Sequence, residues 1–172
     1  MSIYLVAIAL LNPVAWLLKP AYAVFQDVQH IRVEVVSKKA ETEGADKIYQ
    51  LGSNPSVLVI LRNDTDQRVK ALVVDTYYQN RPRLFKDGKL VPYRETVKNL
   101  VAAKDNDPEF VSTVSGVFIA PYSSREIQAL NLTDWYGPLQ PGSYKFTNRY
   151  RLTIDGPWTA DSAELRFEVK AE

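Results

Sequence analysis

The sequence predicts an all-β protein, an immunoglobulin-like antiparallel β-sandwich of about seven to nine strands. The strongest observation is an alternation over residues 144–154, in which apolar side chains occupy even positions and only Asn148 breaks the pattern. A period of two is typical of a strand with one buried face. After the turn Asp155-Gly156-Pro157, residues 165–169 alternate in the same way. Turn-forming residues also recur about every eight to twelve positions, as in known sandwiches.

The earlier strands follow from the same patterns, taken in chain order. A continuous apolar run over residues 57–61 is typical of a central strand covered on both faces. The pair Asp87-Gly88 readily adopts the positive φ values of a tight turn and predicts a hairpin around it. The expected strands and hairpin cover residues 29–36, 57–61, 69–78, 84–91, 110–119 and 125–132.

One segment departs from the strand pattern. Val97, Leu100, Val101 and Lys104 recur at spacings of three and four, which predicts a short helix within an insertion over residues 92–107. The apolar face of this helix is either a lid on the sandwich or a stripe that binds a partner.

The first 23 residues are predicted to be a signal peptide, followed by one domain over residues 24–172. Residues 3–18 are mostly apolar, and Ala21-Tyr22-Ala23 has the small-x-small form of a cleavage site after Ala23. The apolar run is shorter than the about 20 residues that a membrane span needs. We therefore expect a secreted or periplasmic protein without a membrane span in the mature chain. Because no basic residue precedes the run, an uncleaved signal-anchor is the alternative.

Composition excludes several classes of partner and chemistry. The chain has no cysteine, so it has no disulfide, no thiol chemistry and no lipid anchor on cysteine. Of 21 basic residues, Lys19 is lost with the signal, which leaves 20 against 20 acidic residues and a net charge of zero. Such a chain has no basic field to attract nucleic acid or an anionic membrane.

Candidate catalytic and metal-binding residues are few. His30 is the only histidine and lies on a predicted edge strand, so we expect no catalytic triad and no zinc site. Two acidic turns lack the spacing of a calcium-binding EF-hand loop, and turns favour such residues for their own hydrogen bonds. These turns contain Asp64, Asp66 and Asp75, and Asp105, Asp107 and Glu109. The sequence therefore predicts no cofactor and no metal, and the protein is not expected to be an enzyme.

Large aromatic residues near strand ends are the remaining candidates for function. They either plug the open ends of the core or grip a partner. Together with the helix face, they form the possible interaction surface: Trp135, Tyr136, Trp158, Val97, Leu100 and Val101.

The C-terminal third also carries a resemblance. Tyr144 follows the turn glycine Gly142 by two residues, as in the tyrosine corner, whose hydroxyl would bond a backbone carbonyl near Leu139. The run from Asn131 to Tyr144, the turn ending at Trp158 and the strand over 165–169 resemble bacterial secreted immunoglobulin-like domains of unknown function. Residues 56–169 are similar, more distantly, to BsuPI-type proteinase inhibitors.

These observations predict a non-catalytic domain that binds an unknown protein partner in the cell envelope or outside the cell. The first alternative is a proteinase inhibitor that presents residues 99–110 as an extended, substrate-like loop. The second alternative is a hydrolase with a pair of carboxylates, which would meet in space and not along the chain.

Overall fold

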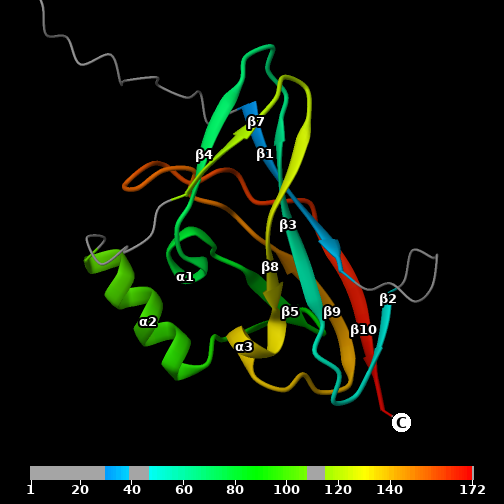
Figure 1. The fold of residues 1–172 in the computed structure, drawn as a ribbon. Helices are drawn as coiled ribbons and strands as arrows, with labels where there is room; N and C mark the ends of the chain where they lie inside the picture. Colours follow the sequence, from blue (N-terminus) through cyan, green and yellow to red (C-terminus); the bar gives the residue numbers. More distant parts are fainter. Residues whose placement is uncertain (1–29, 39–46, 108–114, 172) are drawn as a thin grey trace, which may run out of the picture.

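The computed structural model describes residues 30–38, 47–107 and 115–171. The predicted signal peptide and its cleavage site lie outside the described residues, as does Glu109. Within the described residues the chain forms ten strands and three short helices (Figure 1). The expected sandwich is confirmed, with one strand and two helices more than the sequence predicts.

One sheet has three antiparallel strands in the order β1 (Ile31–Ser37), β3 (Ser56–Asn63) and β8 (Ser124–Asn131). β3 is central, as its apolar run predicts, and its side chains alternate between buried and half-buried. The half-buried side chains of Leu58 and Ile60 lie on the outer face. The outer face is therefore covered only in part, while the inner face is fully buried.

The second sheet has five strands and faces the first across the core. Its order is β2 (Lys47–Gln50), β10 (Leu165–Lys170), β9 (Gly142–Thr147), β5 (Arg83–Lys86) and β6 (Lys89–Val91). All pairs are antiparallel except β2 with β10, which is parallel. The expectation that all strands pair antiparallel is therefore wrong at this edge of the sheet.

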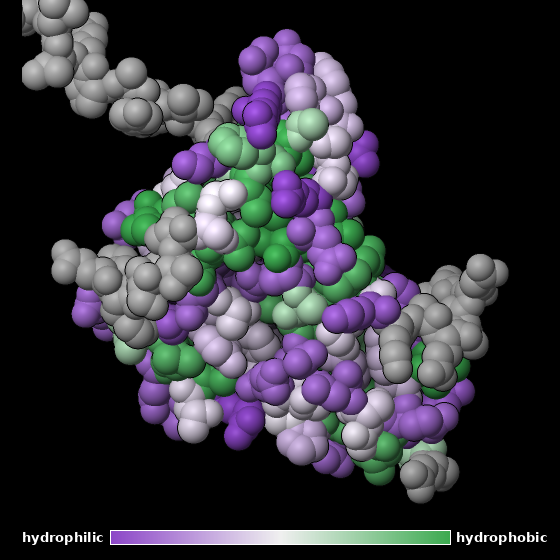
Figure 2. All heavy atoms as spheres, in the orientation of Figure 1, coloured by the Kyte–Doolittle hydropathy of each residue, from purple (hydrophilic) through white to green (hydrophobic). Residues whose placement is uncertain are grey.

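A third pair of strands, β4 (Val69–Val73) and β7 (Ser115–Ile119), forms a ribbon beside α1 in Figure 1. Figure 2, in the same orientation, shows apolar residues gathered near the ribbon, with hydrophilic residues above and below them. The ribbon thus extends the sandwich beyond its two main sheets.

The core contains inward side chains from both main sheets, and the ring of Tyr144 stacks on Phe167 at 5.0 Å. The Tyr144 hydroxyl donates a hydrogen bond of 2.6 Å to the backbone carbonyl of Gln140. The predicted tyrosine corner is thereby confirmed, and it closes the Pro-Gly turn onto β9.

The alternation over residues 144–154 is confirmed only in part. The strand ends at Thr147, yet Asn148, Tyr150 and Leu152 remain buried beyond it. Ile154 is 38% exposed, so its predicted inward position is wrong. The cause is the turn that follows, in which Asp155 takes a left-handed conformation (φ 53°) and reverses the chain.

The predicted strand over 69–78 is also too long. It ends at Val73, and α1 (Thr76–Gln79) follows. The Asp75 side chain accepts hydrogen bonds from the backbone N–H groups of Tyr77 (2.8 Å) and Tyr78 (3.1 Å). This N-cap stabilises a helical turn where β-branched and aromatic residues indicate a strand.

The predicted insertion contains α2 (Glu95–Asn106), which confirms the helix. A further helix, α3 (Leu132–Tyr136), connects β8 to the Pro-Gly turn. None of the helices in the described ranges has the length and apolar character needed to cross a membrane.

Candidate functional site

Trp135 lies in the core and not on a binding surface. α3 places its ring inside the sandwich end, where the residue is 1% exposed. The ring contacts Tyr77 at 4.8 Å and Tyr93 at 5.4 Å between centroids. Of the two alternatives for Trp135, the structure therefore favours the plug.

The helix face and Tyr136 lie beside this plug. Val97 is buried, Leu100 is half-buried, and Val101 and Tyr136 pack as half-buried residues against the core. Burial raises the pKa of the Tyr136 hydroxyl far above its ordinary value. This face of α2 thus packs on the sandwich as a lid, through Val97 and Val101.

Trp158 is half-buried, like Tyr136, but it differs from the other predicted aromatic residues because it is surrounded by cations. The guanidinium carbons of three arginines lie over its ring, at 4.6 Å for Arg81, 5.0 Å for Arg149 and 4.5 Å for Arg151. Each distance is within the range of a cation–π interaction. We call Arg81, Arg149, Arg151, Trp158 and the acid Asp105 the arginine–tryptophan cluster.

Arg81 is held in place by the end of α1. Its Nη1 donates to the carbonyls of Tyr77 and Asn80, both at 2.7 Å, and its Nη2 donates to Oδ1 of Asp105. Such contacts satisfy carbonyls that a helix end leaves without partners. Arg81 is therefore fixed before any ligand arrives.

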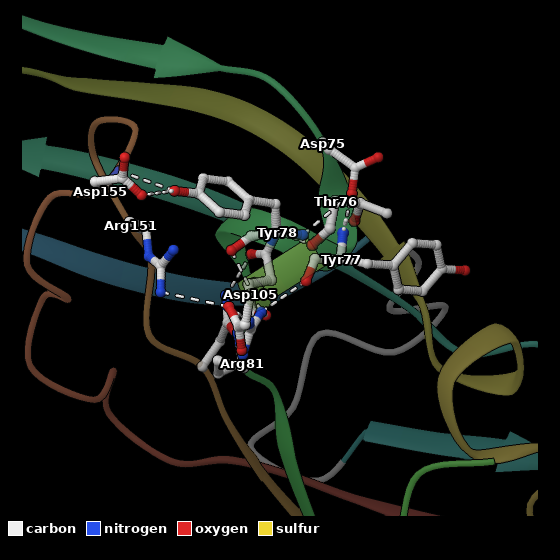
Figure 3. A network of polar contacts seen from close by, with 10 residues as sticks. Asp75, Thr76, Tyr77, Tyr78, Arg81, Asp105, Arg151 and Asp155 are labelled. Atoms are coloured by element: carbon white, nitrogen blue, oxygen red, sulfur yellow. Dashed lines mark hydrogen bonds and ion pairs between the residues drawn. The ribbon is translucent and has the colours of Figure 1, made fainter. Parts of the chain in front are cut away.

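Arg151 approaches the same carboxylate from another side (Figure 3). Its Nη2 lies 3.5 Å from Oδ1 of Asp105, and its guanidinium also stacks on Tyr78 at 4.5 Å. The backbone of Arg151 is bound through Gln79, whose carbonyl accepts from the Arg151 N–H and whose Nε2 donates to the Arg151 carbonyl. One oxygen of Asp105 thus serves two arginines.

Asp105 comes from the last turn of α2, and a neighbouring ion pair holds that turn. Lys104 Nζ lies 2.8 Å from Oδ2 of Asp75, whose other oxygen caps α1. The Lys104 side chain is nearly buried. The predicted insertion therefore delivers a carboxylate to the cluster through an anchored helix end.

A buried amide network lies below the arginines. Asn148 donates from Nδ2 to Oδ1 of Asn80 (2.7 Å) and accepts at Oδ1 from the backbone N–H of Arg81 (3.1 Å). Both asparagines are fully buried. The one polar residue in the apolar alternation thus joins the chain around Arg81 to the end of β9.

Among the described residues, no three or more His, Cys, Asp or Glu side chains come together in a group that could hold a metal ion. Asp64 accepts hydrogen bonds from Arg32 and Arg62, which lower the pKa of the Asp64 carboxyl. Asp66 is exposed, and Asp107 ends α2. In the first turn Asp64 is thus paired with arginines, and in the second turn Asp105 is paired with Arg81.

His30 is exposed at the start of β1, and its backbone carbonyl accepts from the N–H of Asp64. Of the hollows lined by described residues, a larger one beside β2 contains no carboxylate, and a smaller one beside α1 contains only Asp134. Neither hollow supplies the carboxylate pair that a hydrolase needs.

The extended inhibitory loop expected over residues 99–110 is wrong for residues 99–106, because these are helical in α2. Residues 108–110 lie outside the described ranges. A helix cannot supply the extended conformation of a substrate-like loop.

Sequence patterns single out Trp158 but not its arginines. Arg149 and Arg151 share the polar face of the alternating segment, a spacing that places both side chains on one side of a strand. Arg81 and Asp105 are distant from these two arginines in the sequence. They reach the cluster because α1 and α2 place them there. A pair of same-face arginines near a tryptophan was the only available signal.

No family model matches this chain, and no curated protein matches it in sequence. A CARDB domain from Pyrococcus furiosus, crystallised in complex with di-metal ions, is similar with a TM-score of 0.39 and 12% identity, over 83% of this chain and 94% of that one. Its solution structure gives a TM-score of 0.35 at 12% identity, over 81% and 94%. A β-glucosidase from Listeria innocua in complex with glucose gives 0.36 at 11% identity, over 81% of this chain and 16% of the enzyme. Similarities this distant assign neither a family nor a function.

Proposed function

We propose that this chain is a secreted, non-catalytic binding domain that contacts a protein partner through the arginine–tryptophan cluster. The observation that carries the proposal is Trp158, a half-buried tryptophan with three guanidinium groups over its ring. Tryptophan and arginine are the side chains that most often dominate the energy of protein interfaces. The cluster places both types together at a partly exposed site, where Arg149 is exposed and Asp105 is 39% exposed.

The position of the cluster supports the same function. Trp158 follows the turn after residue 154, and Asp105 lies in the last turn of α2, so both lie in connections between strands. Connections on a rigid sandwich are the usual place for binding residues, because they vary without disturbing the core. The side chain of Arg81 is held by α1 and that of Arg151 by stacking on Tyr78, so the two guanidinium groups need little further ordering when a partner binds.

Photo-crosslinking in the native host tests this proposal. A benzophenone amino acid replaces Trp158 in the full chain, and a matched protein carries the same group at Tyr122, which is 70% exposed at the turn before β8. We expect one discrete protein adduct from position 158 that position 122 does not give. Identical adduct patterns at the two positions, or none at position 158, would overturn the proposal.

Export is tested separately on the same cells. The proposal expects the protein in the extracytoplasmic fraction, with Val24 as its first residue. Intact mass measurement distinguishes this product from the full chain. A protein retained in the cytoplasm with residues 1–23 attached would remove secretion from the proposal.

A further inference from the structure

We infer that the arginine–tryptophan cluster recognises side-chain carboxylates of an acidic protein segment, and that Asp105 occupies the position of such a carboxylate in the unbound domain. This inference rests on the proposed function and names the chemistry of the partner. It follows from the charge, the geometry and the accessibility of the cluster.

The cluster has an excess of positive charge. Three guanidinium groups surround one ring, and the ion pairs of the cluster involve a single acid, Asp105, bound by Arg81 and Arg151. The net charge of these four side chains is +3 − 1 = +2. Among the described residues, Arg149 has no carboxylate partner. Like charges held this close repel one another, so an incoming anion would lower the energy of the arrangement.

Neighbouring acids do not remove this excess. Asp75 is paired with Lys104, and Asp161 is paired with Arg83, which lies outside the cluster. Asp155 directs Oδ1 at the Tyr78 hydroxyl, at 3.2 Å. In Figure 3 Asp155 lies at the far end of the Tyr78 side chain, while Asp105 lies between the two arginines.

The guanidinium of Arg151 is positioned by stacking more than by hydrogen bonds. It contacts the rings of Tyr78 and Trp158, each at 4.5 Å, while its buried Nε has no hydrogen-bond partner and its Nη2 reaches Asp105 only at 3.5 Å. A guanidinium carries five N–H donors in one plane, and a carboxylate can accept two of them at once. Asp105 therefore leaves part of the donor capacity of the Arg151 Nη groups unused, while the buried Nε is closed to a ligand.

Asp105 shows which anion fits. Its carboxylate is already seated between Arg81 and Arg151, and its side chain is 39% exposed, so solvent and ligands reach it. A carboxylate from a partner has the same charge and the same planar acceptor geometry. Arg149 is exposed and lies over the same indole ring, so its guanidinium can bind a second carboxylate of an acidic segment.

The test uses the full mature chain, residues 24–172, and two probe peptides, hexaglutamate and hexaglutamine. Binding is followed by isothermal titration calorimetry and by the fluorescence of the tryptophans. We expect hexaglutamate to bind and hexaglutamine not to bind. Raising NaCl from about 25 to 300 mM should weaken binding at least fivefold, because salt screens exposed charges.

Three variants locate the site. Arg149→Gln should weaken hexaglutamate binding about five- to tenfold, as expected for an exposed interfacial charge. Arg166→Gln, which removes an exposed arginine of β10 outside the cluster, is the matched control and should leave affinity unchanged. Asp105→Asn, which keeps Oδ1 but removes the competing charge, should strengthen binding severalfold. Circular dichroism confirms that each variant folds.

The possible results decide the inference. Equal effects of Arg149→Gln and Arg166→Gln, or weaker binding by Asp105→Asn, would overturn it. Competition by inorganic phosphate as effective as that by acetate would show a general oxyanion site and overturn the carboxylate assignment. An adduct from position 158 without hexaglutamate binding would leave the proposed function intact and remove this inference alone.

Discussion

Lys104 Nζ lies 2.8 Å from Oδ2 of Asp75, and the lysine side chain is only 8% exposed. This contact ties the last turn of α2 to the first turn of α1, because Asp75 also caps α1. Asp105 follows Lys104 directly, so the same contact sets where the cluster receives its carboxylate. This ion pair therefore contributes both to the stability of the fold and to the geometry of the candidate site.

The first prediction concerns this ion pair. Asp75→Ala should lower the free energy of unfolding by about 2–4 kcal/mol, because it removes a helix cap and breaks a largely buried pair. Lys104→Met should be milder, and the double variant should lose less than the sum of the two. Urea denaturation measures all three.

The control for this prediction is Glu95→Ala, which breaks the exposed Glu95–Lys98 pair on the same helix. An exposed pair of this kind contributes at most about 1 kcal/mol. Strict additivity of Asp75→Ala and Lys104→Met would show that the two side chains do not interact energetically.

The second prediction concerns the buried amide of Asn148. Asn148→Ala leaves Oδ1 of Asn80 without its partner, while the N–H of Arg81 keeps its second acceptor, the Arg149 carbonyl at 3.1 Å. A buried polar group without a partner costs about 1–3 kcal/mol, so we expect a loss of about 2 kcal/mol in unfolding free energy. Asn54→Ala, at an exposed position, should cost under about 1 kcal/mol. Similar losses at both positions would contradict a structural role for the network.

The third prediction is a loss of stability in alkali. Burial raises the pKa of Tyr93 from 10.0 to about 12, and its hydroxyl donates to the Pro82 carbonyl at 2.7 Å. Because the folded state holds this proton more tightly than the unfolded state, the contribution is complete below pH 10 and is lost between pH 10 and 12. One such tyrosine gives a slope of at most about −1.4 kcal/mol per pH unit.

Urea denaturation between pH 8 and pH 11.5 measures this slope. Tyr93→Phe should reduce it, since phenylalanine has no proton to lose. Tyr122→Phe, at a position that is 70% exposed, should leave it unchanged. Burial also raises the pKa of Tyr150, so part of the slope should remain in Tyr93→Phe. A stability independent of pH up to 11.5 would contradict the prediction.

Much of the sandwich is predictable because burial imposes a period of two on its strands. The run in β3, the alternation in β9 and β10, and the Pro-Gly turn before Tyr144 each carry their structure locally. The helix of the insertion is also predictable, because burial of one helix face places apolar residues at spacings of three and four.

Local patterns fail where a helix cap, a turn or a long-range contact overrides propensity. The segment after Val73 has strand-forming residues, but the Asp75 cap and the pair with Lys104 favour a helix. Ile154 continues an apolar register that the Asp155 turn ends. The parallel pairing of β2 with β10 joins segments that are distant along the chain.

Trp135 and Trp158 show most clearly what the sequence determines and what only the tertiary structure decides. By itself, the sequence determines a mostly β sandwich with a helical insertion, and it places Trp135 and Trp158 near strand ends. Only the tertiary structure decides that Trp135 is buried among tyrosines while Trp158 meets Arg81, Arg149 and Arg151. The physical reason is that hydrophobic periodicity is a local property of the chain, whereas charge clustering depends on which distant segments the core brings together.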